Sequence, residues 1–234
     1  MSLALYEESI ALTDATAAAG VPMSLLGGAA VFLHCPQAIA AGPYRELADI
    51  DAVTTKRGAR DLTAALEARG YEPDSRFNAM HGDRRMIFNG PRGKLDLFVG
   101  EFEMCHRIDL TDRVGIEPRT LPVADLLATK LQIVELNEKD ARDAAALLRE
   151  HELGSGPGDH VDVDYLNGLV GSDWGLWRTL DGTLAALGEL EPDVAPRANE
   201  LREAFEAAPK SRGWKMRARV GERKRWYELP EEVG

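Results

Sequence analysis

The chain has 234 residues, of which 44% are hydrophobic, and this size is enough to bury at least one sizeable core. Its formal charge of −11 and its pI near 5.0 argue against a protein that coats nucleic acid without selection. No segment approaches the roughly 18 uncharged apolar residues of a membrane span and no basic leader with an apolar run is visible, so we expect a cytoplasmic protein. The two cysteines, Cys35 and Cys105, have no metal-ligand spacing and predict reduced core thiols.

The first part of the chain predicts a helix, a short strand and a second helix. Residues 3–19 suit an amphipathic helix, and the apolar run 23–26 suits a buried strand. Gly27 and Gly28 follow, and residues 29–34 have a helical composition. Backbone N–H groups at such a strand-to-helix turn can face an anion. An ordinary tight turn is the alternative for a bare pair of glycines.

Residues 48–54 alternate apolar and acidic side chains with a period of two, which predicts a strand. Residues i and i+2 of a strand lie on one face, about 6.5–7 Å apart, so Asp49 and Asp51 would present two carboxylates to the same side. Carboxylates this close repel each other unless a cation lies between them, and hard oxygen ligands suit Mg²⁺ or Mn²⁺. Taken alone, such a pair is more often simply a solvated strand face.

A helix over 57–69 and two further strands are predicted next. Residues 85–88 and 94–99 are strand-like, and the loop between them has the length and composition of a hairpin connection. Asp96 lies in the middle of the second strand, where aspartate is disfavoured. It either shares a cation with the earlier aspartates or lies on a solvated face beside Lys94.

The character of the sequence then changes from strands to helices. Two strands and two Ala- and Leu-rich helices are predicted, over 106–110, 116–121, 123–136 and 138–150. Lys130 falls on the apolar stripe of the first of these helices. Either its stem snorkels to the surface, or its ammonium group points into a cleft where it meets phosphate.

The last third of the chain predicts a linker, helices and a basic tail. The Gly-Ser-Gly-Pro-Gly segment 154–158 suits a flexible linker, and residues 162–208 suit two or three helices. Residues 210–234 carry 8 Lys or Arg against 4 Asp or Glu, with aromatic residues between them. This composition is compatible with RNA binding, because cations neutralise phosphates and rings stack on unpaired bases; a basic element docked on an acidic body is the alternative. The residues expected to contact RNA are Arg212, Trp214, Lys215, Arg217 and Arg219.

The order of these motifs resembles the nucleotidyltransferase fold of the DNA polymerase β superfamily, and most closely the AbiEii/AbiGii-type bacterial toxin nucleotidyltransferases. In that family a G-G-x-A-h stretch precedes R-x-x-x-D-h-D, matched here by residues 27–31 and 45–51. A later K-L pair and a K-D-x-x-D helix start are matched by residues 130–131 and 139–143. The resemblance covers residues 20–150, with Gly-Gly where many superfamily members have Gly-Ser, and it does not extend to the rest of the chain.

The resemblance implies an α+β fold with a nucleotidyltransferase-like mixed sheet flanked by helices. The α/β core would span 1–121, a helical pair over 122–153 would complete the cleft, and a helical C-terminal region with the basic aromatic tail would span 159–234. The catalytic residues implied are Asp49, Asp51, Asp96 and Lys130, the three aspartates as ligands of Mg²⁺ or Mn²⁺. The nucleotide-binding residues implied are Gly27, Gly28, Arg45 and Lys130.

The activity implied is metal-dependent transfer of a nucleoside monophosphate from an NTP to an RNA acceptor, with the 3′ end of tRNA as the expected acceptor. The same resemblance implies a toxin-like protein, with an antitoxin as an expected partner. One alternative is a small-molecule nucleotidyltransferase of the antibiotic-modifying kind, because an acidic cleft attracts cationic aminoglycosides. The other is a catalytically silent member that binds a nucleotide or a protein partner; the complete set of three aspartates counts against it.

Overall fold

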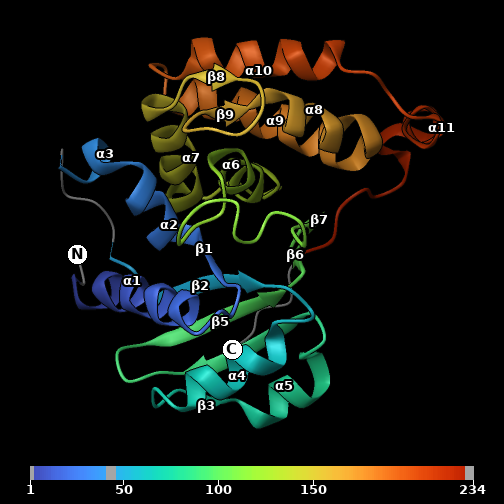
Figure 1. Cartoon of the computed structure of the whole chain (residues 1–234). Coiled ribbons are helices and arrows are strands. Elements are labelled where there is room, and N and C mark those ends of the chain that lie inside the picture. Colours follow the sequence, from blue (N-terminus) through green and yellow to red (C-terminus); the bar gives the residue numbers. More distant parts are fainter. Residues whose placement is uncertain (1–2, 41–45, 230–234) are drawn as a thin grey trace. The chain divides into compact units, whose positions relative to one another are not determined.

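The computed structural model describes residues 3–40 and 46–229 and shows an α+β protein, as the sequence predicts (Figure 1). The chain divides into two compact units. The first unit contains the described residues up to Phe102 together with Ile108–Pro122, and the second contains Glu103–Arg107 and the chain from Val123 onward. None of the helices in the described ranges is both long and apolar enough to cross a membrane.

The first unit is built on a mixed five-stranded sheet with the strand order β1-β2-β5-β4-β3. Its strands are β1 (Ser24–Leu26), β2 (Asp49–Thr54), β3 (Glu72–Pro73), β4 (Arg85–Asn89) and β5 (Lys94–Val99). The central strands β2 and β5 are parallel, whereas the other neighbours are antiparallel, and β4 and β5 form the predicted hairpin. The alternation along β2 and β5 places Ile50, Ala52, Leu95 and Leu97, all fully buried, on one face of these two strands.

The described part of the first unit also contains five helices. They are α1 (Leu3–Ala18), α2 (Gly27–His34), α3 (Pro36–Ala40), α4 (Ala59–Glu67) and α5 (Ser75–His81). Helices α1 and α2 contact β1 and β2, and α5 lies against β4 (Figure 1). Helix α2 starts directly at Gly27, two residues earlier than the composition indicated.

The strand predicted over 116–121 is wrong. Residues 116–119 form bends, and the one β-type contact of this described segment is an isolated bridge between Thr120 and Leu25. Pro118 has no N–H to donate to a ladder, and Arg119 adopts a positive φ of 70°, which interrupts an extended chain. The strand predicted over 106–110 is confirmed in a shorter form as β7 (Arg107–Asp109), which pairs with β6 (Glu101–Glu103).

The second unit is mainly helical. Its helices are α6 (Val123–Leu131), α7 (Glu138–Glu150), α8 (Val163–Ser172), α9 (Trp174–Leu190), α10 (Ala195–Ala207) and α11 (Arg212–Val220), followed by the 3-10 turn η1 (Gly221–Arg223). Helix α9 contacts every other α-helix of the unit and buries Leu180, Leu184 and Leu187 completely. Helix α6 ends five residues earlier than predicted, and Asn137 caps α7 by accepting a hydrogen bond from the Asp140 N–H.

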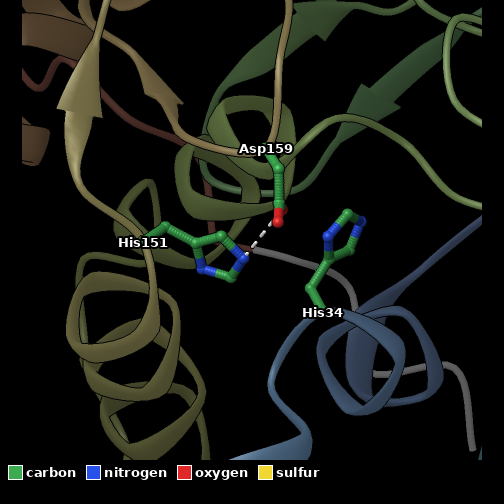
Figure 2. A group of neighbouring side chains, drawn as sticks. All are labelled: His34, His151 and Asp159. Atoms are coloured by element: carbon green, nitrogen blue, oxygen red, sulfur yellow. Dashed lines mark ion pairs between the residues drawn. The ribbon is translucent and has the colours of Figure 1, made fainter.

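The expected linker is a closed turn inside the second unit. The short strands β8 (Leu153–Gly154) and β9 (Val161–Asp162) pair in parallel on its two sides. The His160 ring occupies the space where a Cβ at Gly154 or Gly158 would lie, which explains these glycines. His151 Nε2 lies 3.3 Å from a carboxylate oxygen of Asp159 and ties the turn to the end of α7 (Figure 2). His34, also drawn there, belongs to the first unit, where its Nε2 lies 2.8 Å from Thr120 Oγ1.

Candidate active site

Strands β2 and β5 bring three carboxylates to one face of the sheet. Asp49 and Asp51 alternate along β2, and the parallel register places Asp51 directly beside Asp96 of β5. Because residues in register on neighbouring strands point to the same side, the three side chains share a face. We call Asp49, Asp51 and Asp96 the aspartate face. The side chain of Asp96 is buried, whereas Asp49 and Asp51 are partly exposed.

Gly27 follows β1 directly and lies against the aspartate face. Its φ is +64°, and a Cβ at this position would lie 2.0 Å from Asp51 Oδ2, so the site requires glycine here. Helix α2 starts at this residue, Gly28 is buried in its first turn, and the N-cap residue Leu26 makes no side-chain capping hydrogen bond. The first backbone N–H groups of α2 therefore lie next to a carboxylate. An anion can bind there only if a cation lies between it and Asp51.

Arg85 of β4 binds Asp96 and was missed by the sequence analysis. Its Nε donates a hydrogen bond of 2.7 Å to Asp96 Oδ1, and its Nη2 donates a second one to Oδ2. The guanidinium also lies 5.2 Å from the centroid of the Phe98 ring. The hydrogen bonds to Asp96 raise the pKa of Arg85 against the opposing effect of burial, and the charges of Asp51 and Asp49 raise it further. One guanidinium thus interacts electrostatically with the whole aspartate face.

The predicted hairpin contains a signal for Arg85. The antiparallel register pairs Asn89 with Lys94 and Arg85 with Phe98. Phe98 and Asp96 share a face of β5 because they are two residues apart, so Arg85 must lie on that face too. The register of the hairpin turn is therefore sufficient to place Arg85 beside Asp96.

The charge and donor set of this site fit a divalent cation. Three carboxylates share this face with the guanidinium of Arg85, and Lys94 of β5 lies in register with Asp49. Carboxylate oxygens are the ligands preferred by Mg²⁺ and Mn²⁺. Both oxygens of Asp96 accept hydrogen bonds from Arg85, so Asp49 and Asp51 are the carboxylates nearer to solvent and better placed to receive an ion.

Lys130 lies in the second unit, in a buried cluster of opposite charges. Its Nζ is 2.9 Å from Asp140 Oδ1 and 2.8 Å from Asp143 Oδ2, both on α7. Burial would lower the pKa of Lys130, but Asp143 and Asp140 more than offset it, so the pKa lies above its ordinary value. We call Lys130, Asp140 and Asp143 the lysine cluster. The phosphate contact predicted for Lys130 stays a prediction.

The other predicted site residues are Arg45 and five residues of the basic tail. Arg45 falls outside the described residues. The five tail residues predicted to contact RNA all belong to α11, and they divide between its two sides. The exposed ones are Arg212, Lys215 and Arg219, and the half-buried ones are Trp214 and Arg217.

Solved structures similar to this chain include the two described here. No family model and no curated protein matches the chain. An antigenic nucleotidyltransferase-like protein from Paracoccidioides brasiliensis is 16% identical, with 91% of this chain and 96% of that chain covered and a TM-score of 0.45. The antibiotic-resistance factor ANT(2'')-Ia is 13% identical, with 92% and 94% covered and a TM-score of 0.41. Because both identities and both TM-scores are low, the function proposed below rests on the site and not on these similarities.

Proposed function

We propose that the first unit carries a divalent-metal-dependent nucleotidyltransferase site, which transfers a nucleoside monophosphate from an NTP to an acceptor hydroxyl. The observation that supports this proposal is the register of β2 and β5, which sets Asp51 beside Asp96 with Asp49 on the same face. Gly27 adds the beginning of a helix beside Asp51. Carboxylates for a metal and backbone N–H groups for a phosphate are what binding of a metal–triphosphate complex requires.

Each residue has a defined task in this proposal. Asp49 and Asp51 would hold Mg²⁺ or Mn²⁺, with Asp96 as the third carboxylate of the set. When bound, the metal would neutralise charge on the triphosphate and on the leaving pyrophosphate. Gly27 and Gly28 would let the phosphates approach the backbone of α2 closely, because no Cβ stands in the way.

Arg85 has a positioning task. Its two hydrogen bonds fix the orientation of the Asp96 carboxylate, and its charge keeps three close carboxylates compatible before the metal binds. The protein does little covalent chemistry in nucleotidyl transfer, so positioning and electrostatic stabilisation supply the rate.

The first experiment measures transfer directly. The purified full chain is incubated with Mg²⁺ and each α-labelled NTP in turn, with and without total tRNA, beside Asp49→Asn. The matched control is Asp83→Asn, the same change at a side chain that is 78% exposed and lies outside the site. We expect label transfer by the wild type and by Asp83→Asn, and a loss of more than about a hundredfold for Asp49→Asn, since changes to groups that merely support metal ligands already cost about 10–100-fold.

A second experiment measures metal binding in the absence of nucleotidyl transfer. Mn²⁺ binding, followed by electron paramagnetic resonance, should be strong in the wild type and in Asp83→Asn and weak in Asp49→Asn and Asp51→Asn. Equal Mn²⁺ binding by all four proteins, or transfer that survives in Asp49→Asn, contradicts the proposal. Thermal unfolding of each variant shows whether a lost activity reflects a lost fold.

A further inference from the structure

A pocket of about 750 Å³ lies within the second unit, and its lining residues are distinct from those of the proposed active site. Its wall is formed by residues 103–107, the start of α9, the end of α11 and residues 224–228. This volume is within the range of about 300–1,000 Å³ typical of pockets that enclose a small ligand. A single nucleotide is a ligand of that size.

The wall made by residues 224–228 is fixed by specific contacts. Trp226 Nε1 donates a hydrogen bond of 3.1 Å to Thr179 Oγ1, and its ring packs edge-on against Trp174 with the centroids 6.0 Å apart. The Glu228 N–H donates to the Cys105 carbonyl over 3.0 Å. The pocket is therefore a built feature of the unit.

The inward side of α11 supports this wall. Arg217 donates hydrogen bonds of 2.7 Å to the carbonyl oxygens of Gly221 and Lys224, and its guanidinium lies 4.7 Å from the centroid of the Trp174 ring. The Trp214 ring packs edge-on against Trp177 at 5.3 Å. Arg217 and Trp214 thus hold the tail in place, which is a different task from the RNA contact predicted for them.

The outward side of α11 carries a row of cations. Arg212, Lys215 and Arg219 are exposed, and their spacing places them on one helical face that extends about 10 Å. Val220 follows Arg219 directly at the end of α11, is 39% exposed and lines the pocket. The row of cations therefore ends beside the part of α11 that lines the pocket, and it is too long to serve a single phosphate group.

The pocket combines cations with an aromatic ring. Lys224 and Arg225 line it with exposed side chains, and the Arg225 guanidinium lies 4.8 Å from the centroid of the Tyr227 ring. Tyr227 is half-buried and packs edge-on against Trp226 at 5.3 Å. Rings that stack on bases, together with cations that neutralise phosphates, are the two elements of single-strand recognition.

The carboxylates of the pocket do not oppose this interpretation. Asp173 is committed to the start of α9, where its Oδ1 accepts hydrogen bonds from the N–H groups of Gly175 and Leu176. Glu103 and Glu228 also line the pocket. Carboxylate oxygens accept hydrogen bonds from base N–H groups and from the ribose 2′-hydroxyl, which DNA lacks.

We infer that this pocket and the outer face of α11 bind single-stranded RNA, with a base against Tyr227 and the neighbouring phosphates on Arg212, Lys215 and Arg219. An acidic protein partner would fit the row of cations alone, but it would leave the pocket with its aromatic wall unused. The role of the bound RNA as the acceptor strand rests on the proposed nucleotidyltransferase function, whereas the binding itself does not.

The test measures binding of a fluorescein-labelled single-stranded RNA of 12 nucleotides to the full chain by fluorescence anisotropy. EDTA is present and NTP is absent, so that no nucleotidyl transfer takes place. We expect log K to fall linearly with log[salt]. The double variant Lys215→Ala/Arg219→Ala should weaken binding and reduce the slope by about 1.4, because each lost phosphate contact on a single strand contributes roughly 0.7. The control Arg76→Ala/Lys139→Ala removes the same charge at exposed positions elsewhere and should leave the slope unchanged.

The aromatic contribution is tested separately. Tyr227→Ala should weaken RNA binding by roughly 5- to 150-fold at constant salt slope, and Tyr227→Phe should retain most of the affinity because the ring remains. The thermal unfolding midpoint of each variant is recorded, and Tyr227→Phe keeps the test valid if Tyr227→Ala fails to fold.

Three results would overturn the inference. They are the absence of RNA binding by the wild type, equal RNA affinity of the wild type and a folded Tyr227→Ala, and equally tight binding of polyglutamate, which would indicate an acidic protein partner. Because the assay contains EDTA and no NTP, a failure here leaves the label-transfer experiment untouched. A chain that binds RNA but transfers no label would refute the proposed function alone.

Discussion

Each unit of the molecule surrounds one basic side chain with carboxylates, and the two groups differ in their access to solvent. In the aspartate face, Asp49 and Asp51 stay partly exposed. In the lysine cluster, the side chain of Lys130 is 9% exposed and that of Asp143 is fully buried. The comparison teaches that composition alone does not identify an ion-binding site. Carboxylates can take an ion from solution only where solvent reaches them.

The largest effect is expected in the lysine cluster. Lys130→Met should lower the free energy of unfolding by about 3–5 kcal/mol, because it leaves the buried carboxylate of Asp143 without its partner cation. Urea unfolding measures this loss, and Lys139→Met at an exposed position of α7 should stay within about 0.5 kcal/mol of the wild type. Divalent ions should not restore the stability of Lys130→Met. A loss below about 1 kcal/mol would show that water reaches the cluster.

A smaller loss is expected for Arg85→Gln in the aspartate face. It removes the cation paired with the buried carboxylate of Asp96, and we expect a loss of about 1.5–3 kcal/mol in all, because the Arg85 side chain is 23% exposed and water can replace part of its hydrogen bonding. Here Mn²⁺ should raise the thermal unfolding midpoint of the variant more than that of the wild type, because the ion replaces the charge of the guanidinium. The midpoints are compared with and without Mn²⁺ at matched ionic strength. Equal Mn²⁺-induced shifts of the midpoint in both proteins would contradict the distinction between the aspartate face and the lysine cluster.

A pair of glycine substitutions isolates the contact between backbone and carboxylate. Gly27 and Gly70 both have a positive φ, but a Cβ at Gly70 meets no atom within 4 Å, whereas at Gly27 it would overlap Asp51. Both alanine variants should lose about 1–2 kcal/mol for the left-handed backbone. Gly27→Ala should lose at least about 1 kcal/mol more and should also lose Mn²⁺ affinity, as measured by chemical unfolding and metal titration. Identical losses would mean that Asp51 moves aside without cost.

The smallest effect concerns His106, because burial favours the neutral form of its imidazole ring. Burial lowers the pKa of His106, and the charge of Asp173 offsets this effect only in part. Just below about pH 6.5, the pKa of an unperturbed histidine, the unfolded chain therefore binds more protons than the folded chain. The free energy of unfolding should therefore fall as the pH drops through this region. His106→Gln should reduce this dependence, and His81→Gln at an exposed position should not. An unchanged pH dependence in His106→Gln would assign the effect to other groups.

Much of the aspartate face was predictable because it depends on local pattern. The period-two alternation gave the strand and the common side of Asp49 and Asp51, and the composition of the connecting loop gave the β4–β5 hairpin. The parallel pairing of β2 with β5 was not predictable, since it joins segments far apart along the chain. Arg85 was missed because its position depends on the register of the hairpin and not on the presence of a hairpin.

In the second unit, too, the local pattern did not predict which segments pack together. The spacing of Asp140 and Asp143 indicated a shared helical face, but only the packing of α6 against α7 shows that this face meets Lys130. In the tail, the sequence analysis treated Trp214 and Arg212 as one RNA-contacting set. The helical period of α11 separates them, and that period applies only if the segment is a helix, which its composition did not establish.

The parallel pairing of β2 and β5 also has a consequence for how the protein folds. The segment between these strands contains α4, α5 and β4, so the contact between Asp51 and Asp96 closes a long loop and is expected to form slowly. A slip of one residue would turn Asp96 to the opposite face of the sheet. During refolding, the capacity to bind Mn²⁺ should therefore return after the helical circular dichroism signal, and it would report completion of the correct strand alignment.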